Sequence, residues 1–235
     1  MKYSKVCIIP ARGGSKRIPH KNVKEFFKKP LIAYSIEVAK KSGLFDTIIV
    51  STDDYNIAKI AKEYGASVPF MRPKELSDDF TGTGPVIEHT LEFLQKSGVT
   101  VEYVCTLYAT APLLQEEYLI KGLKLLQESD AHMAFAATSM PFPIQRTFKL
   151  TQDGRCQMFW PENFTKRSQD LEEAYQDAGQ FYWENLQRKA SDIPFGKSSI
   201  AVILPRHLVQ DIDTIEDWDR AELMYEILQK QKENK

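Results

Sequence analysis

The chain has 235 residues, 43% of them hydrophobic, and a formal net charge of −1 at pH 7. This is enough apolar sequence to bury a core as one domain, with or without a small appended arm. A charge near zero excludes bulk binding to nucleic acid or to an anionic membrane, because that affinity requires an excess of cations. No apolar run reaches the roughly 18 residues of a membrane span, so none is predicted.

The cysteines and the N-terminus predict a cytoplasmic protein. Cys7, Cys105 and Cys156 are odd in number and far apart, and the first two lie in apolar runs. Buried, reduced thiols are therefore expected, rather than catalytic or metal-binding ones. The first five residues lead directly into a short apolar strand, without the long apolar region of a signal peptide.

Strands and helices alternate along the first 70 residues. Apolar runs of strand length are found at 6–9 and 47–52, with a shorter piece at 66–70. Helical spacing is found at 31–40 and 55–64, and a glycine follows each of these segments. Continuous apolar strands separated by helices predict a parallel sheet covered by helices on both faces. A ligand crevice is expected beyond the carboxyl ends of the strands.

The alternation continues through most of the remaining sequence. An extended loop is predicted at 71–85, rich in turn-forming residues. Further helices are predicted at 85–95, 115–128 and 214–230, and further strands at 103–108, 134–138, 179–183 and 199–204. Thr214 followed by Asp217 resembles a capping box at the start of the last helix. The fold class is therefore α/β, a three-layer sandwich around a mostly parallel, Rossmann-like sheet.

One segment breaks the pattern. Residues 141–178 begin with Pro141-Phe142-Pro143, are mostly polar, and contain a hairpin signal at Gln152-Asp153-Gly154. We interpret the segment as a small arm inserted into a single domain that spans 1–235. It carries Gln145, Arg146 and Arg167, and Gln180 follows it; these side chains suit a carboxylated, hydroxylated ligand. The alternative is a polar surface between two copies of the chain.

The most informative stretch runs from Ile8 to Asn22. A short apolar strand ends at Pro10, and Gly13-Gly14 follows with several cationic side chains around it. Paired glycines let backbone N–H groups approach a ligand, and Arg and Lys bind phosphate oxygens. The pattern matches neither the dinucleotide motif G-x-G-x-x-G nor the P-loop. We expect it to bind a nucleoside triphosphate; a solvated basic loop is the alternative.

A second feature lies about two hundred residues downstream. Asp211 and Asp213 flank Ile212, so in extended chain both carboxylates face the same way. Mg²⁺ prefers one or two carboxylates together with phosphate oxygens and water, so this pair is a suitable Mg²⁺ site. The alternative is acidic charge that complements the positive end of the following helix.

These motifs resemble those of the CMP-sugar synthetases, the acylneuraminate cytidylyltransferase family. The resemblance is carried by Ile9-Pro10-Ala11-Arg12-Gly13-Gly14-Ser15-Lys16 with Lys21-Asn22, by Ile49-Val50-Ser51-Thr52-Asp53, by Arg72-Pro73-Lys74-Glu75-Leu76 and by Asp211-Ile212-Asp213. It covers nearly the whole chain. Within the family the sequence is most similar to the branch that uses pseudaminic acid, through stretches such as Arg167-Ser168-Gln169-Asp170-Leu171-Glu172 and Asp177-Ala178-Gly179-Gln180-Phe181-Tyr182.

The resemblance implies a nucleotidyltransferase fold, usually a homodimer in which the arm reaches over the partner's site. It also implies roles for particular residues. Arg12, Lys16, Lys21 and Asp213 would be catalytic, and Asp211 and Asp213 would bind Mg²⁺. The nucleotide would be bound by Ala11, Arg12, Gly13, Ser15, Asn22, Arg72 and Thr83, and the sugar by Gln145, Arg146, Arg167 and Gln180.

The expected reaction transfers CMP from CTP to the anomeric hydroxyl of a nine-carbon 2-keto sugar acid, pseudaminic acid, and releases pyrophosphate. The sequence departs from the sialic acid enzymes at Tyr108, Leu114 and Ala178, which makes N-acetylneuraminate a less suitable substrate. Legionaminic, N-acetylneuraminic or an eight-carbon acid remain alternatives. A non-catalytic nucleotide sensor on the same fold is a rival from another class.

Overall fold

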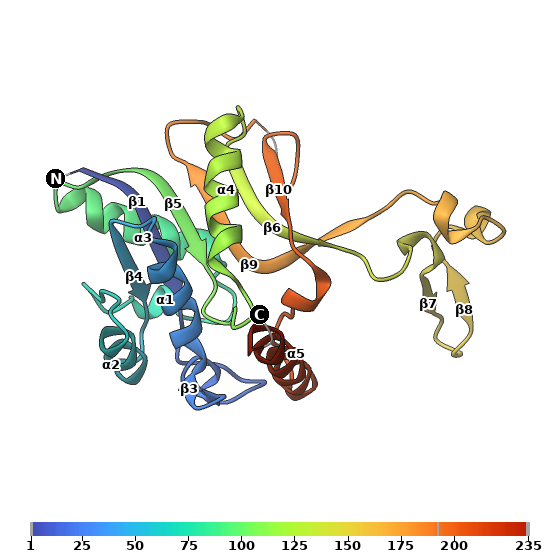
Figure 1. The fold of residues 1–235 in the computed structure, drawn as a ribbon, viewed down its shortest axis with the longest axis horizontal. Helices are drawn as coiled ribbons and strands as arrows, with labels where there is room; N and C mark the ends of the chain where they lie inside the picture. The colour runs from blue at the N-terminus through green and yellow to red at the C-terminus, as the bar shows by residue number, and fades with distance from the viewer. Residues whose placement is uncertain (1, 192, 234–235) are drawn as a thin grey trace.

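The computed structural model describes residues 2–191 and 193–233. A six-stranded sheet forms its centre, in the order β10-β6-β9-β5-β1-β4 (Figure 1). Its strands are β1 (Lys2–Pro10), β4 (Thr47–Ser51), β5 (Thr100–Leu107), β6 (Met133–Ser139), β9 (Tyr175–Asn185) and β10 (Ser199–Ile203). Strand β9 runs antiparallel to both of its neighbours, and the other pairs are parallel. The predicted mostly parallel sheet is confirmed.

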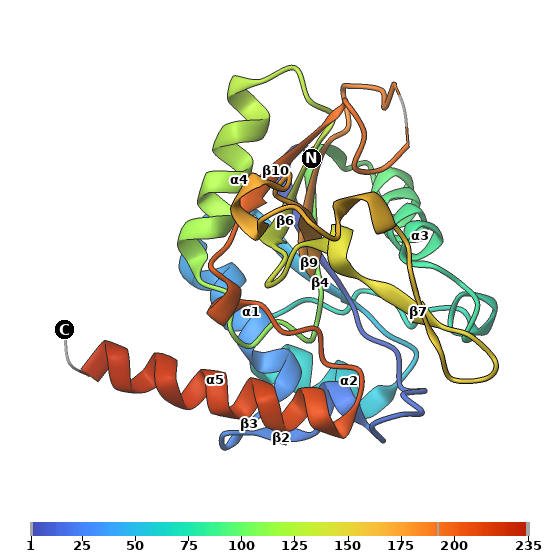
Figure 2. The same cartoon turned by 90° about the vertical axis from the view of Figure 1, so that its right-hand side faces the viewer.

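Helices cover both faces of this sheet (Figure 2). They are α1 (Leu31–Ser42), α2 (Tyr55–Glu63), α3 (Thr83–Lys96) and α4 (Glu116–Glu128), whereas α5 (Ile215–Glu233) packs on the region of β2 and the start of α1 instead. Alternate side chains of β1 point to opposite faces. Val6 and Ile8 therefore pack with α3, whereas Cys7 and Ile9 pack with the side that holds α1, α2 and α4. The three-layer α/β architecture is confirmed.

Local signals in the sequence fix several helix ends. Gly43 ends α1 with φ of 65°, a conformation that glycine adopts without strain. The capping box at α5 is confirmed: the Asp217 N–H donates to Thr214 Oγ1 at 3.2 Å, and the Thr214 N–H donates to Asp217 Oδ2 at 2.8 Å. Helix α3 begins at Thr83, two residues before the predicted start, because Pro85 fits within its first turn.

Two short regions differ from the expectation. Residues 66–70 form no strand. Only Ser67 pairs with the sheet, through a single parallel bridge to Ile49 of the edge strand β4. The region before α1 contains the hairpin β2 (Glu25–Phe26) and β3 (Lys29–Pro30), which was not predicted. Its turn residues Phe27 and Lys28 both have positive φ. Such positions usually hold Gly or Asn, so the sequence carries no signal for this turn. The structure also contains single 3-10 turns: η1 (Lys21–Val23), η2 (Lys74–Leu76), η3 (Ile144–Arg146), η4 (Pro161–Asn163), η5 (Ser168–Asp170) and η6 (Arg206–Leu208).

The arm projects away from the sheet, between β6 and β9 (Figure 1). It contains the predicted hairpin, formed by β7 (Phe148–Leu150) and β8 (Cys156–Met158), with Gly154 at φ of 78° in the turn. Its expected end at residue 178 is too late. Residues 175–178 already belong to β9 and lie opposite the end of β6, so the excursion ends at about residue 174.

Helix α5 brings the C-terminal part of the chain back to the basic loop. Trp218 and Ala221 of α5 pack with Ile18, Phe26 and Ile212 in one buried cluster. The Asp211–Asp213 segment is therefore held beside residues 12–22. Among the described residues, no helix has the length and apolar character to cross a membrane. Cys7 and Cys105 are buried free thiols, as expected, and Cys156 is exposed.

Candidate functional site

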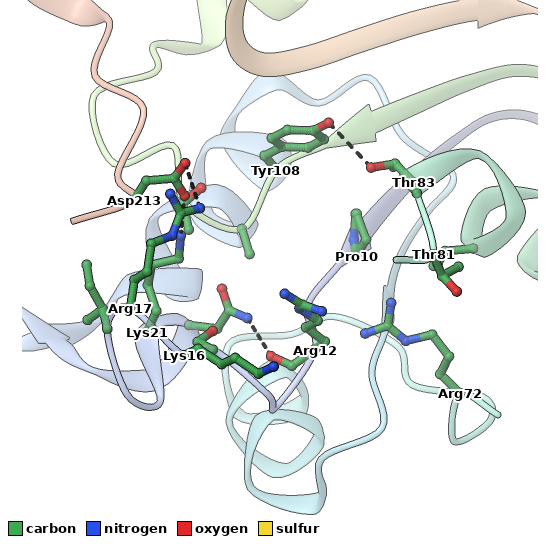
Figure 3. Close-up of a pocket in the computed structure, with 17 residues that line it drawn as sticks. Pro10, Arg12, Lys16, Arg17, Lys21, Arg72, Thr81, Thr83, Tyr108 and Asp213 are labelled. Atoms are coloured by element: carbon green, nitrogen blue, oxygen red, sulfur yellow. Dashed lines mark hydrogen bonds and ion pairs between the residues drawn. The ribbon is translucent and has the colours of Figure 1, made fainter. Parts of the chain in front are cut away.

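A cavity of about 290 Å³ lies at the carboxyl ends of β1 and β5 (Figure 3). Its walls come from the basic loop, the start of α3, the residues after β5 and the segment before α5. Residues far apart in the sequence thus meet at the edge where a ligand crevice was expected. Predicted site residues that line it are Arg12, Ser15, Lys16, Lys21, Asn22, Arg72, Thr83 and Asp213.

The backbone of the basic loop is held by hydrogen bonds to neighbouring elements. The Ala11 N–H donates to the Ser51 carbonyl at 2.9 Å, and Asn22 Nδ2 donates to the Arg12 carbonyl at 2.9 Å. The Gly13 N–H donates to Asp53 Oδ1 at 3.0 Å. The Gly13 amide thus already has an acceptor within the protein, and its expected approach to a nucleotide stays a prediction. A Cβ at Gly13 would lie 2.8 Å from Asp54 Oδ2, so close packing explains this glycine.

Two cations of the loop contact the acidic segment before α5. Arg17 Nη2 lies 2.9 Å from Asp213 Oδ2, and Lys21 Nζ lies 3.3 Å from Asp213 Oδ1. Lys21 Nζ also donates to the Ile212 carbonyl at 2.5 Å. The structure thus brings together the two motifs that the sequence singled out. Arg17 was not among the predicted site residues, because nothing in the sequence distinguishes it from a solvated cation.

The Asp211–Asp213 segment has the alternation expected of extended chain. Ile212 is fully buried, whereas Asp211 and Asp213 lie outside the core. Partial burial raises the pKa of Asp211, and the nearby Asp213 carboxylate adds to this effect. Among the described residues, no group of three or more His, Cys, Asp or Glu is arranged to hold a metal. Two carboxylates suit a cation that takes its other ligands from phosphate and water, as Mg²⁺ does.

Arg72 is a buried cation, and two of its nitrogens donate no hydrogen bond. Its side chain is 4% exposed, and its Nη2 lies 3.5 Å from Asp53 Oδ1 in an ion pair. Neither Nε nor Nη2 makes a hydrogen bond. Burial lowers the pKa of Arg72, and the Asp53 carboxylate opposes that change. Since buried donors without partners are costly, a ligand acceptor in the cavity would stabilise this side chain.

A tyrosine pair connects this cavity to a second one. Tyr108 OH lies 3.4 Å from Thr83 Oγ1, and its ring is 5.4 Å from the ring of Tyr182. Tyr182 OH donates to Asp177 Oδ2 at 2.6 Å. The second cavity, of about 540 Å³, is lined by Asp177, Asp211 and Asp213. Asp213 lines both cavities, so it stands at their boundary.

The sequence profile of the cytidylyltransferase family matches residues 6–213. The chain belongs to this family. A pseudaminic acid cytidylyltransferase of Campylobacter jejuni is 45% identical over 94% of this chain and 96% of its own length. A CMP-N,N'-diacetyllegionaminic acid synthase of Legionella pneumophila is 30% identical, over 95% and 97% of the two chains.

A solved cytidylyltransferase structure has the same fold. The CMP:2-keto-3-deoxy-manno-octonic acid synthetase complexed with CTP aligns with a TM-score of 0.65 and 16% identity. The alignment covers 94% of this chain and 98% of that one. The predicted nucleotidyltransferase fold is thus confirmed.

In this cytidylyltransferase the predicted sugar-binding residues do not line either cavity. Gln145 and Arg146 lie in the arm, where they donate to the backbone carbonyls of Glu172 and Lys166. Arg167 pairs with the neighbouring Asp170. Gln180 is buried in β9 and donates to the Leu208 carbonyl at 2.6 Å. The three arm residues therefore stay predictions that require a second copy of the chain.

Proposed function

We propose that the protein is a pseudaminic acid cytidylyltransferase. It transfers CMP from CTP to the anomeric hydroxyl of pseudaminic acid and releases pyrophosphate. The observation that carries this proposal is the 45% identity to the Campylobacter jejuni protein of that name over nearly the full length of both chains. The cation-lined cavity at the sheet edge supports it, because CTP is a polyanion that such a cavity suits.

The nucleotide would occupy the cavity of about 290 Å³. Arg12, Ser15, Lys16 and Lys21 would bind the triphosphate, since they come from one loop and line one wall. Asn22, Arg72 and Thr83 would surround the cytidine. Arg72 has the strongest structural argument, because its buried Nε and Nη2 make no hydrogen bond and would be stabilised by an acceptor such as a base oxygen. Ala11 and Gly13 would shape the loop through their backbone contacts.

Asp211 and Asp213 would hold Mg²⁺. The Asp213 carboxylate lines the nucleotide cavity, so a cation bound there would lie within reach of phosphate oxygens. When bound, the metal supplies positive charge that neutralises the phosphates and orients them. The release of Asp213 from Arg17 or Lys21 would leave those side chains free to bind the nucleotide.

The reaction needs no covalent intermediate with the enzyme. The anomeric hydroxyl oxygen forms a bond to the α-phosphorus of CTP and loses its proton to the solvent, while the bond between that phosphorus and the leaving pyrophosphate oxygen breaks. Positioning and fixed positive charge account for the rate, as in other phosphoryl transfers. Arg12, Lys16 and Lys21 provide that charge around the transferring and leaving phosphates.

The sugar acid would lie in the cavity of about 540 Å³, because Asp213 separates it from the nucleotide cavity. A hydroxyl at that boundary would face the α-phosphorus. Gln145, Arg146 and Arg167 would contribute from the arm of a second subunit in a homodimer, since they do not line these two cavities of their own subunit. Gln180 would support the site through β9. The enzyme would be cytoplasmic, because CTP is available there and because its three free cysteines suit a reducing compartment.

Pyrophosphate release from CTP tests the proposal. The purified protein is incubated with CTP and, in turn, pseudaminic, legionaminic, N-acetylneuraminic and an eight-carbon sugar acid, with and without EDTA. We expect the fastest release with pseudaminic acid and its loss in EDTA. A faster rate with legionaminic acid would favour the alternative suggested by the Legionella pneumophila relative. CTP binding without release with any acid would indicate a nucleotide sensor.

A further inference from the structure

Residues 77–82 connect η2 to α3 and form one rim of the nucleotide cavity. The Asp78 side chain closes a turn by accepting hydrogen bonds from the Phe80 N–H at 3.0 Å and the Thr81 N–H at 2.6 Å. Phe80 is 94% exposed, and Thr81 lines the cavity. Asp79, which follows Asp78, faces the basic loop.

The Asp79 carboxylate pairs with two cations of that loop. Arg12 Nη1 lies 2.9 Å from Asp79 Oδ1, and Lys16 Nζ pairs with Asp79 Oδ2. Arg12 Nη1 also donates to the Asp78 carbonyl at 2.6 Å. The hydrogen bond from Lys16, together with the charges of Lys16 and Arg12, holds the pKa of Asp79 below its ordinary value, so the carboxylate is ionised at neutral pH. An anionic group whose two oxygens face two different cations has the charge and spacing of a phosphate.

We propose that Asp79 occupies the place of a phosphate group in the ligand-free protein, and that CTP must displace it from Arg12 and Lys16. This inference rests on the proposed function, because it takes these two cations as triphosphate ligands. Displacement is required because Arg12 Nη1 already contacts two acceptors of the 77–82 segment. A triphosphate placed there would also meet the negative charge of Asp79 at close range.

The contact is weak enough for displacement. Side chains of Lys16 and Asp79 are 78% and 34% exposed, and ion pairs between exposed groups contribute little free energy. Even so, a competitor built into the protein lowers the apparent affinity for every polyanion that uses the same cations, because only the displaced state can bind. Removal of the carboxylate should therefore tighten the binding of phosphate-containing ligands by about 3- to 10-fold.

Calorimetric titration of three ligands tests the proposal. CTP, inorganic tripolyphosphate and cytidine are titrated into the wild-type protein, Asp79→Asn and Asp79→Ala, without added divalent metal. We expect both variants to lower the Kd of CTP and of tripolyphosphate by about 3- to 10-fold and to leave the Kd of cytidine unchanged. Asp219→Asn serves as the control, since Asp219 is exposed on α5, lines neither cavity and carries the same charge.

A double-mutant cycle adds a second test. In a Lys16→Ala background one of the two partners of Asp79 is absent, so the gain from Asp79→Asn should shrink. Equal Kd values of CTP for the wild type and both Asp79 variants would overturn the displacement and leave the nucleotide site intact. An equal gain for cytidine would also overturn it, because cytidine has no phosphate. Failure of the wild-type protein to bind CTP and tripolyphosphate would instead reject the proposed function itself.

Discussion

Lys16 lines the cavity of about 290 Å³, and its side chain is 78% exposed. It packs little against the core, so its removal should not affect folding. Its charge would act on the leaving phosphates, where the loss of one such donor costs about 10²–10³ in rate. We expect Lys16→Ala to lower turnover by about that factor and to leave the melting temperature unchanged. Initial rates of pyrophosphate release and thermal unfolding measure the two effects.

Lys124→Ala is the matched control for Lys16→Ala. Lys124 is also exposed, on α4, and pairs with Glu128 at 3.8 Å away from both cavities. Its loss should change neither turnover nor stability. If Lys16→Ala keeps near-wild-type turnover, the cation is a solvated surface group and the proposed role is wrong.

Asp213 makes a sharper prediction, because it contacts the basic loop and lines both cavities. Asp213→Asn keeps the shape of the side chain and removes the charge that a metal needs. We expect the variant to bind CTP at least as well as the wild type, since Lys21 and Arg17 lose a competing anion. Turnover should fall by about 10²-fold or more. Calorimetry with CTP and pyrophosphate release at increasing Mg²⁺ concentrations check the two statements.

Asp219→Asn is again a suitable control, because it removes the same charge outside the cavities. A nucleotide sensor would keep its affinity for CTP in Asp213→Asn and would release no pyrophosphate in either form. Normal turnover in Asp213→Asn would argue against the metal role of the Asp211–Asp213 segment.

Several site residues could be predicted because their chemistry is visible in the sequence. Arg12, Lys16 and Lys21 follow a strand and surround a glycine pair, and all three line the cavity. Asp79 could not be found in this way, and Tyr108 was noticed only as a departure from the sialic acid enzymes. Asp79 reaches the site only through the turn that Asp78 makes, and Tyr108 is placed by the neighbouring strand β9. Such contacts depend on tertiary structure, which spacing along the chain does not encode.

At the scale of elements, the packing of α4 on β9 depends on one glycine. A Cβ at Gly122 would lie 2.9 Å from Phe181 Cε2 and 3.0 Å from Trp183 Cδ1. Neither ring can move easily, because both are fully buried and Trp183 Nε1 donates to the Leu119 carbonyl at 3.1 Å. Glycine inside a helix otherwise costs stability relative to alanine, so its presence here reflects the close approach.

We expect Gly122→Ala to lower the free energy of unfolding by about 1–2 kcal/mol. Overpacking in a core costs about 1–3 kcal/mol, and the better helix propensity of alanine returns up to about 1 kcal/mol of that. Gly84→Ala is the control, since a Cβ at Gly84 in α3 meets no atom within 4 Å. It should be neutral or stabilising. Urea unfolding of both variants gives the comparison, and equal stabilities would show that α4 can shift away from the sheet.

Element types were largely predictable from apolar periodicity and end signals, and the exceptions have physical causes. Residues 66–70 look like a strand, but the edge strand β4 offers them only one bridge through Ile49. The β2–β3 hairpin was missed because Phe27 and Lys28 occupy positive-φ turn positions that usually hold Gly or Asn. Strand β9 extends to Tyr175 because the end of β6 is available as a partner.

At the scale of the whole molecule, the arm is the part whose shape and surface are hardest to explain from one copy of the chain. It projects from the sheet between β6 and β9, and its large apolar side chains are exposed (Figure 1). Exposed residues of this kind include Phe142, Phe148, Leu150, Phe159, Trp160 and Phe164. Apolar groups gathered on a projecting element favour an interface with another chain. A homodimer in which each arm covers the partner's site would bury them.

Mixing two inactive variants tests this arrangement directly. Lys16→Ala removes a residue of the nucleotide cavity, and Arg167→Ala removes a residue of the arm. If the arm acts on the partner's site, each variant alone is inactive. A heterodimer of the two then has one site with an intact Lys16 and an intact arm, and one site that lacks both. Unfolding and refolding the two variants together at equal amounts makes half of the dimers mixed, so about one quarter of the wild-type activity should return.

A mixed sample that stays inactive would contradict this arrangement. If the arm served its own subunit, every site in the mixture would lack either Lys16 or Arg167, and no activity would return. Sedimentation of the wild-type protein should also show a dimer. Arg155→Ala in the arm hairpin, which removes an exposed pair with Asp153, is the control for the arm variant and should remain active alone. Recovery of activity in the mixed sample would therefore show that Arg167 acts on the site of the partner subunit.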